Sequence, residues 1–206
     1  MSDPHRIESE EQLREVIAGP HPAVAQKVFD HVDEYAAAFI ERSPLALLAT
    51  SGPDGSLDVS PKGDAPGFAL VDSPGTLLLP DRPGNKLAYG FRNILATGRV
   101  GLIFLVPGAA ETLRVNGRAE LTRNPELLES LAARGKPALL VTRVSVEECF
   151  FHCGKAFVRS KLWKPDTWPE GFKAGIAPQL ARKFGGGEEL ASTLDEGLER
   201  DMRENL

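Results

Sequence analysis

This sequence lacks most of the features that indicate a metal site, a nucleic-acid surface or a membrane segment. It has two cysteines, and three of its four histidines, His5, His21 and His31, lie near the N-terminus, so no second Cys/His cluster exists to complete a zinc site. The net charge of −5 argues against nucleic acid and anionic membranes as main partners, because both require a basic face. The longest apolar runs, such as residues 100–107, are much too short to cross a membrane, and the N-terminus has no signal-peptide pattern. We therefore expect a cytoplasmic protein.

The two cysteines, Cys149 and Cys153, are close together in the sequence, with His152 between them. We interpret them as reduced, partly buried thiols on one side of a short helix, because a disulfide is disfavoured in a reducing compartment. His152 follows Phe150 and Phe151, and we expect it to be packed and hydrogen-bonded rather than catalytic. No metal ligand is predicted.

The chain is long enough to form one globular domain with appended elements, since 206 residues with 42% hydrophobic content can bury a sizeable core. Residues 1–43 are predicted to form N-terminal helices that pack on a barrel domain at residues 44–165. Residues 166–206 are predicted to form a C-terminal helical tail, in which three consecutive glycines separate two helices.

The hydrophobic pattern predicts a mainly β protein with helices, of the α+β class. A capping box at Ser9 predicts a short helix that ends near Gly19-Pro20, and apolar residues at three- and four-residue intervals predict a long helix over 23–42. Strands are predicted at 45–50, 57–60, 67–72, 76–79, 100–106, 112–122 and 138–146, and further helices at 85–96, 125–133 and 148–163. Six or so short strands with few helices between them indicate an antiparallel barrel.

Two polar, glycine-containing turns are the most informative part of the sequence. They are Ser60-Pro61-Lys62-Gly63-Asp64 and Asp81-Arg82-Pro83-Gly84-Asn85-Lys86, and each follows an apolar run. Their cations supply charge, their glycines let the backbone approach a ligand, and the second turn precedes a predicted helix whose free N–H groups favour a phosphate. The turns therefore predict a site for a phosphorylated cofactor, although such charges can also be ordinary solvated turn residues.

These turns, together with other segments in the same order, resemble a known family. The matching segments are Asp58-Val59-Ser60-Pro61-Lys62-Gly63-Asp64, Leu79-Pro80-Asp81-Arg82-Pro83-Gly84-Asn85-Lys86, Arg92-Asn93-Ile94-Leu95, Gly101-Leu102-Ile103-Phe104-Leu105-Val106-Pro107-Gly108, Thr112-Leu113-Arg114-Val115-Asn116-Gly117 and Phe151-His152-Cys153-Gly154-Lys155-Ala156-Phe157-Val158-Arg159-Ser160-Lys161-Leu162-Trp163. Over about residues 40–163 the chain resembles the pyridoxamine 5'-phosphate oxidase-related, FMN-binding split-barrel family. It is most similar to a bacterial subfamily whose reaction is unassigned.

The resemblance implies a six-stranded antiparallel split β-barrel of the FMN-binding type, with N-terminal and C-terminal helices. It also implies a homodimer that holds FMN at the interface between its two chains. The expected cofactor-binding residues on one chain are Ser60, Lys62, Arg82, Asn85 and Lys86, with the cations at the phosphate. From the other chain they are Lys155, Arg159, Ser160 and Trp163, which share one face of a predicted helix. Arg159 and Trp163 could alternatively only stack at a surface or interface.

For the reaction, the resemblance implies an FMN-dependent oxidoreductase that acts on a small organic molecule, with NADH or NADPH as a candidate electron donor. The sequence lacks the Arg-rich first phosphate motif and the C-terminal Arg-x-His element of true pyridoxamine 5'-phosphate oxidases, so oxidation of vitamin B6 is not expected. No catalytic residue is predicted. Two alternatives stay open: a non-catalytic flavin-binding or redox-sensing module, and a haem-binding or haem-degrading split-barrel protein with His152 as the iron ligand.

Overall fold

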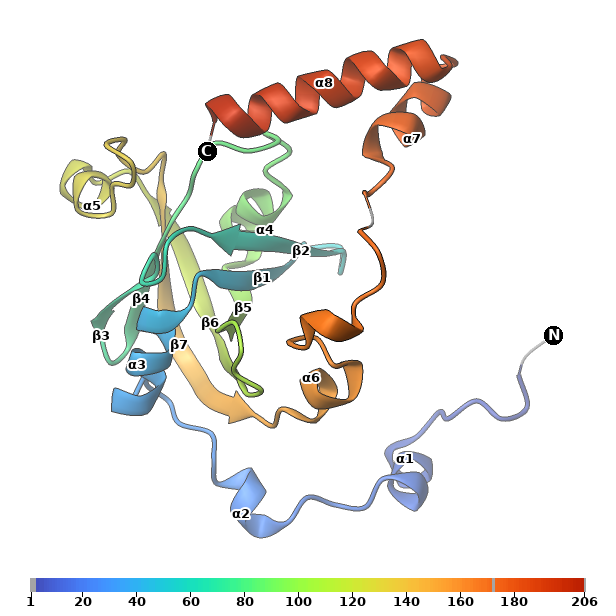
Figure 1. Ribbon diagram of the computed structural model, residues 1–206. Coiled ribbons are helices and arrows are strands. Elements are labelled where there is room, and N and C mark those ends of the chain that lie inside the picture. Colours follow the sequence, from blue (N-terminus) through green and yellow to red (C-terminus); the bar gives the residue numbers. More distant parts are fainter. Residues whose placement is uncertain (1–2, 172, 206) are drawn as a thin grey trace.

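A single antiparallel sheet forms the centre of the protein, as the computed structural model shows for residues 3–171 and 173–205 (Figure 1). The strand order across the sheet is β2-β1-β5-β6-β7-β4-β3. The strands are β1 (Leu45–Ser51), β2 (Leu57–Gly63), β3 (Leu70–Ser73), β4 (Thr76–Pro80), β5 (Arg99–Leu105), β6 (Thr112–Thr122) and β7 (Val141–His152).

The sheet agrees with the predicted fold class but not with the predicted number of strands or with a closed barrel. A mainly antiparallel β fold with helices is confirmed, but the sheet has seven strands and is not closed, so the prediction of a six-stranded barrel is wrong. Its two edges are β2 and β3. The edge strand β3 has four residues and pairs with β4 through a short hairpin.

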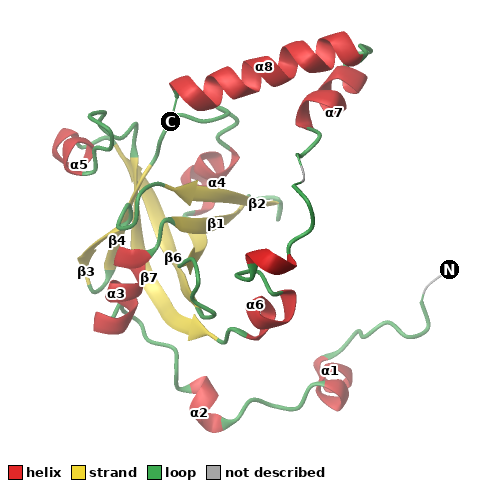
Figure 2. Cartoon of the chain, viewed as in Figure 1, coloured by secondary structure: helices red, strands yellow, loops and turns green. Residues whose placement is uncertain are grey.

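Helices surround the sheet, and Figure 2 shows them in red at its periphery. They are α1 (Glu10–Val16), α2 (Pro22–Ala25), α3 (Glu34–Arg42), α4 (Tyr89–Thr97), α5 (Pro125–Ser130), α6 (Lys155–Ser160), the short 3-10 helix η1 (Pro165–Thr167), α7 (Ile176–Lys183) and α8 (Glu188–Glu204). The N-cap of α1 is Ser9, whose hydroxyl accepts a hydrogen bond from the N–H of Gln12 as the capping pattern predicts. No helix among the described residues is long and apolar enough to cross a membrane.

The main core lies on one face of the sheet, to which alternate residues of β1 and β5 point. A second, smaller cluster is formed by Leu78, Leu131, Ala138 and Val141. In β1 the inward residues are Ala46, Leu48 and Thr50, all buried, and the residues between them are exposed or half-buried. Leu102 and Phe104 of β5 lie beside them in the next strand and are also buried. The α3 helix adds Ala36 and Ile40 to the same core.

The predicted helix over 23–42 is interrupted in the structure. Between α2 and α3 the backbone of Phe29 forms an isolated antiparallel bridge with Cys149 of β7, with N···O distances of 3.0 and 2.7 Å. The carboxylate of Asp33 then accepts a hydrogen bond from the N–H of Ala36 and starts α3. The pairing with β7 satisfies the backbone groups of Phe29, which a continuous helix would have satisfied locally.

The predicted helix over 148–163 is also wrong in its first part. Residues up to His152 continue β7, where Cys149 lies opposite Val115 of β6, and the helix starts only at Lys155. Cys149 is therefore a buried core residue on a strand and Cys153 an exposed residue after it, so they do not share a helix face. Burial, helped by the nearby charge of Asp33, raises the pKa of the Cys149 thiol to about 11.

Candidate functional site

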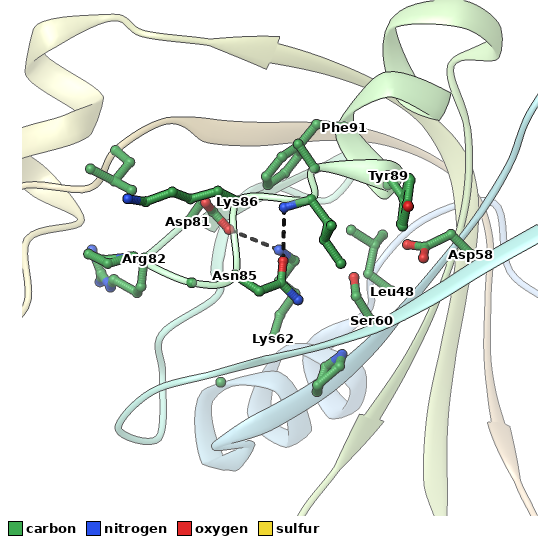
Figure 3. A pocket seen from close by; sticks show the side chains of 18 of the residues that line it. Leu48, Asp58, Ser60, Lys62, Asp81, Arg82, Asn85, Lys86, Tyr89 and Phe91 are labelled. Atoms are coloured by element: carbon green, nitrogen blue, oxygen red, sulfur yellow. Dashed lines mark hydrogen bonds and ion pairs between the residues drawn. The ribbon is translucent and has the colours of Figure 1, made fainter. Parts of the chain in front are cut away.

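A pocket of about 590 Å³ lies where β2 meets the loop that connects β4 to α4. Figure 3 shows its lining side chains, which come from β2, from loop residues 81–88 and from the start of α4. Leu48 of β1 and Leu139, which precedes β7, supply apolar wall. Of the nine predicted cofactor-binding residues, the pocket brings together five: Ser60, Lys62, Arg82, Asn85 and Lys86.

Strand β2 lines the pocket from Asp58 to Gly63, and every second residue of it is half-buried. These residues are Asp58, Ser60 and Lys62, and the residues between them are exposed. The strand extends to Gly63, beyond the predicted end at residue 60, and Pro61 pairs with Leu47. A proline is tolerated there because β2 is an edge strand that has no neighbour on its outer side.

Lys62 is held in place by a carboxylate and an aromatic ring. Its Nζ donates to Oδ1 of Asp81 at 2.8 Å and lies 4.5 Å from the ring centroid of Phe91. The Lys62 side chain is 20% exposed. The ammonium group is therefore fixed at the pocket wall, where its remaining hydrogen-bond donors can reach an anionic ligand.

Arg82 is engaged on the side of its guanidinium that faces Asp64 and the end of α5. Nε donates to Oδ2 of Asp64 at 2.8 Å, and one terminal nitrogen donates to the carbonyl of Leu131, also at 2.8 Å. The other terminal nitrogen, Nη1, is buried without a hydrogen-bond partner in the described part of the chain. Arg82 thus connects the loop to the end of β2 and to the segment after α5, and the N–H groups of Nη1 are left for a ligand.

These contacts change the pKa of the Asp64 carboxyl group. Burial by itself raises the pKa of this carboxyl. Hydrogen bonds from Arg82 and from the N–H of Ala65, with the charges of Arg82 and Arg134, outweigh that effect, so the pKa is lowered overall. The Asp64 side chain is only 8% exposed, and its ionised form is therefore part of the folded structure.

The loop that follows Arg82 has an unusual backbone. Lys86 and Ala88 have φ values of 62° and 55°, in the left-handed region, and the side chain of Asn85 accepts a hydrogen bond from the N–H of Leu87 at 3.0 Å. The helix begins at Tyr89 rather than at Asn85 as predicted, because the left-handed Ala88 precedes it. Lys86 is exposed, and no carboxylate lies within 4 Å of it among residues 3–171 and 173–205.

The pocket has basic side chains on one side and an acidic side chain with a hydroxyl group on the other. Figure 3 shows Arg82 and Lys86 on one side of it and Asp58 with Tyr89 on the other. Asp58 can sit against the start of α4 because residue 90 is a glycine, where an added Cβ would come within 3.2 Å of its Oδ2. One side of the pocket therefore suits an anionic group, and the other suits a group that donates hydrogen bonds.

Sequence reasoning missed several residues that line the pocket, among them Asp58, Asp81, Tyr89 and Phe91. The alternation of Asp58, Ser60 and Lys62 along one strand is a signal that could have found Asp58. Asp81 is next to Arg82 in the predicted turn, but its pairing with Lys62 depends on the fold. Tyr89 and Phe91 carry no motif that distinguishes them from ordinary helix residues.

The other four predicted cofactor residues do not line the pocket of their own chain. Lys155, Arg159 and Ser160 lie on α6, and the hydroxyl of Ser160 donates to the carbonyl of Phe157. Trp163 stacks on Phe157 at 5.9 Å and donates from Nε1 to the carbonyl of Ala109 at 2.7 Å. Their assignment to a second chain stays a prediction.

His152 lies outside the pocket, at the end of β7. Its Nε2 is buried and has no hydrogen-bond partner among the described residues, so the expectation of a hydrogen-bonded histidine is not met at this atom. Within residues 3–171 and 173–205, no group of three or more His, Cys, Asp or Glu side chains is placed to hold a metal ion.

The sequence of residues 32–153 matches the family model described as pyridoxamine 5'-phosphate oxidase. The chain belongs to this family. The resemblance found in the sequence motifs is thereby confirmed. A search of curated proteins gave no match.

Several solved structures are similar to this member of the oxidase family. The HupZ protein of Group A Streptococcus is 18% identical, with 58% of this chain and 93% of that chain covered and a TM-score of 0.48. A candidate pyridoxamine 5'-phosphate oxidase from Lactobacillus delbrueckii is 24% identical, with coverage of 59% and 95% and a TM-score of 0.47. A Clostridium acetobutylicum protein related to general stress protein 26 is 13% identical, with coverage of 58% and 86% and a TM-score of 0.43.

Proposed function

We propose that the pocket beside β2 binds FMN and that the protein is an FMN-dependent oxidoreductase acting on a small organic molecule. The observation that carries the proposal is the pocket itself, in which a cationic loop and apolar walls enclose about 590 Å³ in a chain of this family. Its volume falls within the range of about 300–1,000 Å³ that is common for small-molecule and cofactor sites.

The residues present fit the parts of FMN. Lys86, which has no acidic partner among the described residues, and Lys62 would hold the phosphate, with Nη1 of Arg82 and the side chains of Ser60 and Asn85 as further donors. Leu48, Phe91 and Leu139 offer apolar surface to a flat ring system. These roles are proposals for the same five residues that the sequence predicts.

FMN, when bound, supplies the transfer of a hydride through its ring system. The chain's own part is binding, orientation and electrostatics. Asp81 holds the ammonium of Lys62 at one place on the wall, and the glycine at position 90 lets the carboxylate of Asp58 lie at the opposite side of the pocket. Asp58 can accept a hydrogen bond from a ring N–H or from a substrate donor. No side chain of the pocket is assigned a catalytic role.

We also propose that the protein is a homodimer whose second chain completes this site. The support is the outer surface of edge strand β2 beside the pocket, where Leu57 is 82% exposed and Val59 is 63% exposed. Exposed apolar residues on an edge strand favour association. The second chain would bring Lys155, Arg159, Ser160 and Trp163 to the cofactor.

The phosphate assignment is tested by Lys86→Gln, with Lys183→Gln on α7 as the matched control. Removing one charge-assisted contact costs about 1.5–3 kcal/mol, so we expect the FMN dissociation constant to rise roughly ten- to hundred-fold in Lys86→Gln. Quenching of flavin fluorescence during titration of flavin-free protein measures it. Equal affinities in wild type, variant and control would refute the assignment.

The oxidoreductase assignment needs a second measurement on the flavin-loaded protein. Loss of flavin absorbance after NADH or NADPH is added without oxygen would support an enzyme. A protein that binds FMN but is not reduced by either nucleotide would instead be a flavin-binding module, which is the alternative left open by the sequence.

A further inference from the structure

A cluster of basic side chains surrounds the ring of Phe150 near the end of β7. Nζ of Lys27 lies 5.1 Å from the ring centroid, Cζ of Arg114 lies 5.6 Å from it, and the ring of His152 lies 5.1 Å from it, centroid to centroid. We call these four residues the Phe150 cluster. They come from the segment after α2, from β6 and from β7.

The cluster is distinct from the FMN pocket. None of its four residues lines that pocket, which includes the start of α4. Figure 1 shows the arrowhead of β7, where the cluster lies, at the end of the sheet away from α4. The cluster therefore cannot be an extension of the proposed cofactor site within one chain.

Arg114 differs from the other arginines on the same two strands. Arg118 of β6 pairs with Glu147, and Arg143 of β7 pairs with Asp72 and Glu120. Arg114, by contrast, has no carboxylate within 4 Å in the part of the chain that the structure describes, and neither has Lys27. Among the described residues, Lys27 makes one side-chain hydrogen bond, of 3.0 Å from Nζ to the carbonyl of Phe151.

The surroundings of His152 also lack negative charge. Burial, followed by the positive charges of Arg114 and Lys27, lowers the pKa of His152, and no acidic group offsets them. Asp33 and Glu148 are nearby in the fold, but Asp33 caps α3 and Glu148 accepts a hydrogen bond from Asn116. Nε2 of His152 is buried without a partner among the described residues.

We propose that Lys27, Arg114 and His152 form a second binding site, specific for a phosphate-type oxyanion, either free or carried by a small organic molecule. Two permanent cations and an imidazole that can be protonated match the charge of a phosphate dianion. The planar guanidinium of Arg114 can bind two phosphate oxygens at once, while Lys27 contributes a point charge. Each of these groups lies against the ring of Phe150, which orders the two cations through cation–π contacts. The inference does not rest on the proposed flavin function.

The test is an NMR titration of the histidine ring signals of the full chain with inorganic phosphate, with sodium chloride at the same ionic strength as reference. His152→Asn identifies the His152 signal. Bound phosphate stabilises the imidazolium, so we expect a saturable shift and a higher pKa for His152 in phosphate than in chloride. Arg114→Gln should weaken the apparent phosphate affinity about tenfold or more, whereas Arg118→Gln, which alters a paired and exposed arginine, should leave it unchanged.

Lys27→Gln keeps the proposal testable if Arg114→Gln does not fold, because Lys27 lies outside the sheet strands. The proposal is overturned if phosphate and chloride shift the His152 signals equally. It is also overturned if phosphate binds to Arg114→Gln, or to Lys27→Gln in its place, as tightly as to wild type.

Discussion

At the scale of single residues, Arg82 differs most from what the sequence predicts. The sequence places it in an anion-binding turn, but the structure engages its guanidinium with Asp64 and with the carbonyl of Leu131. Turn chemistry predicts that a cation is present, whereas its partners come from the end of β2 and from the segment after α5. Those partners could not be predicted, since only the folded sheet brings the three segments together.

We therefore expect Arg82→Ala to act first on stability. The substitution leaves the carboxylate of Asp64 almost buried with only the more distant Arg134 as a cationic partner. Loss of one member of a buried ion pair costs about 3–5 kcal/mol, and the 20% exposure of Arg82 places this case near the lower end. Urea unfolding at neutral pH measures the change, and a loss below about 1 kcal/mol would show that the pair is not structural.

The same pair predicts how stability depends on pH. The folded-state pKa of Asp64 lies below its ordinary value of 3.8, so its stabilising contribution is present above that value and is lost as the pH falls through the folded pKa. Wild type should thus lose stability more steeply below about pH 4 than Asp64→Asn, in which this carboxyl is absent. Parallel pH profiles of unfolding free energy for the two proteins would contradict the account.

At the scale of elements, local patterns located most strands but misassigned two helices. Residues 23–42 and 148–163 carry three- and four-residue apolar spacing, yet Phe29 pairs with Cys149, and β7 runs through Cys149 to His152. The deciding interactions are between segments that are distant in the sequence: Phe29 and Lys27 contact β7, and residues 149–152 of β7 pair with β6. Spacing along the chain contains no information about such pairing.

The junction of β6 and β7 depends on the glycine at position 117. The register shifts between Asn116 and Gly117, and an added Cβ at Gly117 would lie 2.0 Å from the carbonyl oxygen of Ser145. Backbone must move to accommodate it, so we expect Gly117→Ala to lower the unfolding free energy by about 3 kcal/mol or more. Thermal and urea unfolding measure the loss.

Gly75→Ala is the matched control for this prediction. An added Cβ at Gly75 meets no atom within 4 Å, and its φ is not in the left-handed region. We expect a change within about 0.5 kcal/mol for this control. Equal stabilities of Gly117→Ala and Gly75→Ala would mean that the β6–β7 bulge tolerates a side chain.

At the scale of the whole molecule, the family was identifiable from the sequence because its motifs keep their order over about residues 40–163. The five pocket residues predicted from one chain do meet in one place, since the loop after β4 reaches β2, where Asp81 pairs with Lys62. The residues on and after α6 do not meet them. Whether a second chain supplies these residues depends on assembly, which no single-chain pattern encodes.

The proposed dimer predicts an effect of a charge on the outer side of β2. Val59→Glu would place a carboxylate in the apolar contact, so we expect the dimer to dissociate in sedimentation or light-scattering measurements. Leu70→Glu on β3, at the opposite edge of the sheet, is the control and should leave the mass unchanged. A wild-type monomer, or a Val59→Glu dimer as tight as wild type, would remove this interface from the account.

The central claim is that the pocket beside β2 holds FMN, and the most direct test is the amount of FMN retained per chain. Flavin-free protein is incubated with excess FMN, passed through a gel-filtration column and denatured, and the released flavin is identified by mass and quantified by absorbance. The account predicts about one FMN per chain, lost in large part when Lys86→Gln is treated in the same way. Wild-type protein that emerges without flavin would contradict it.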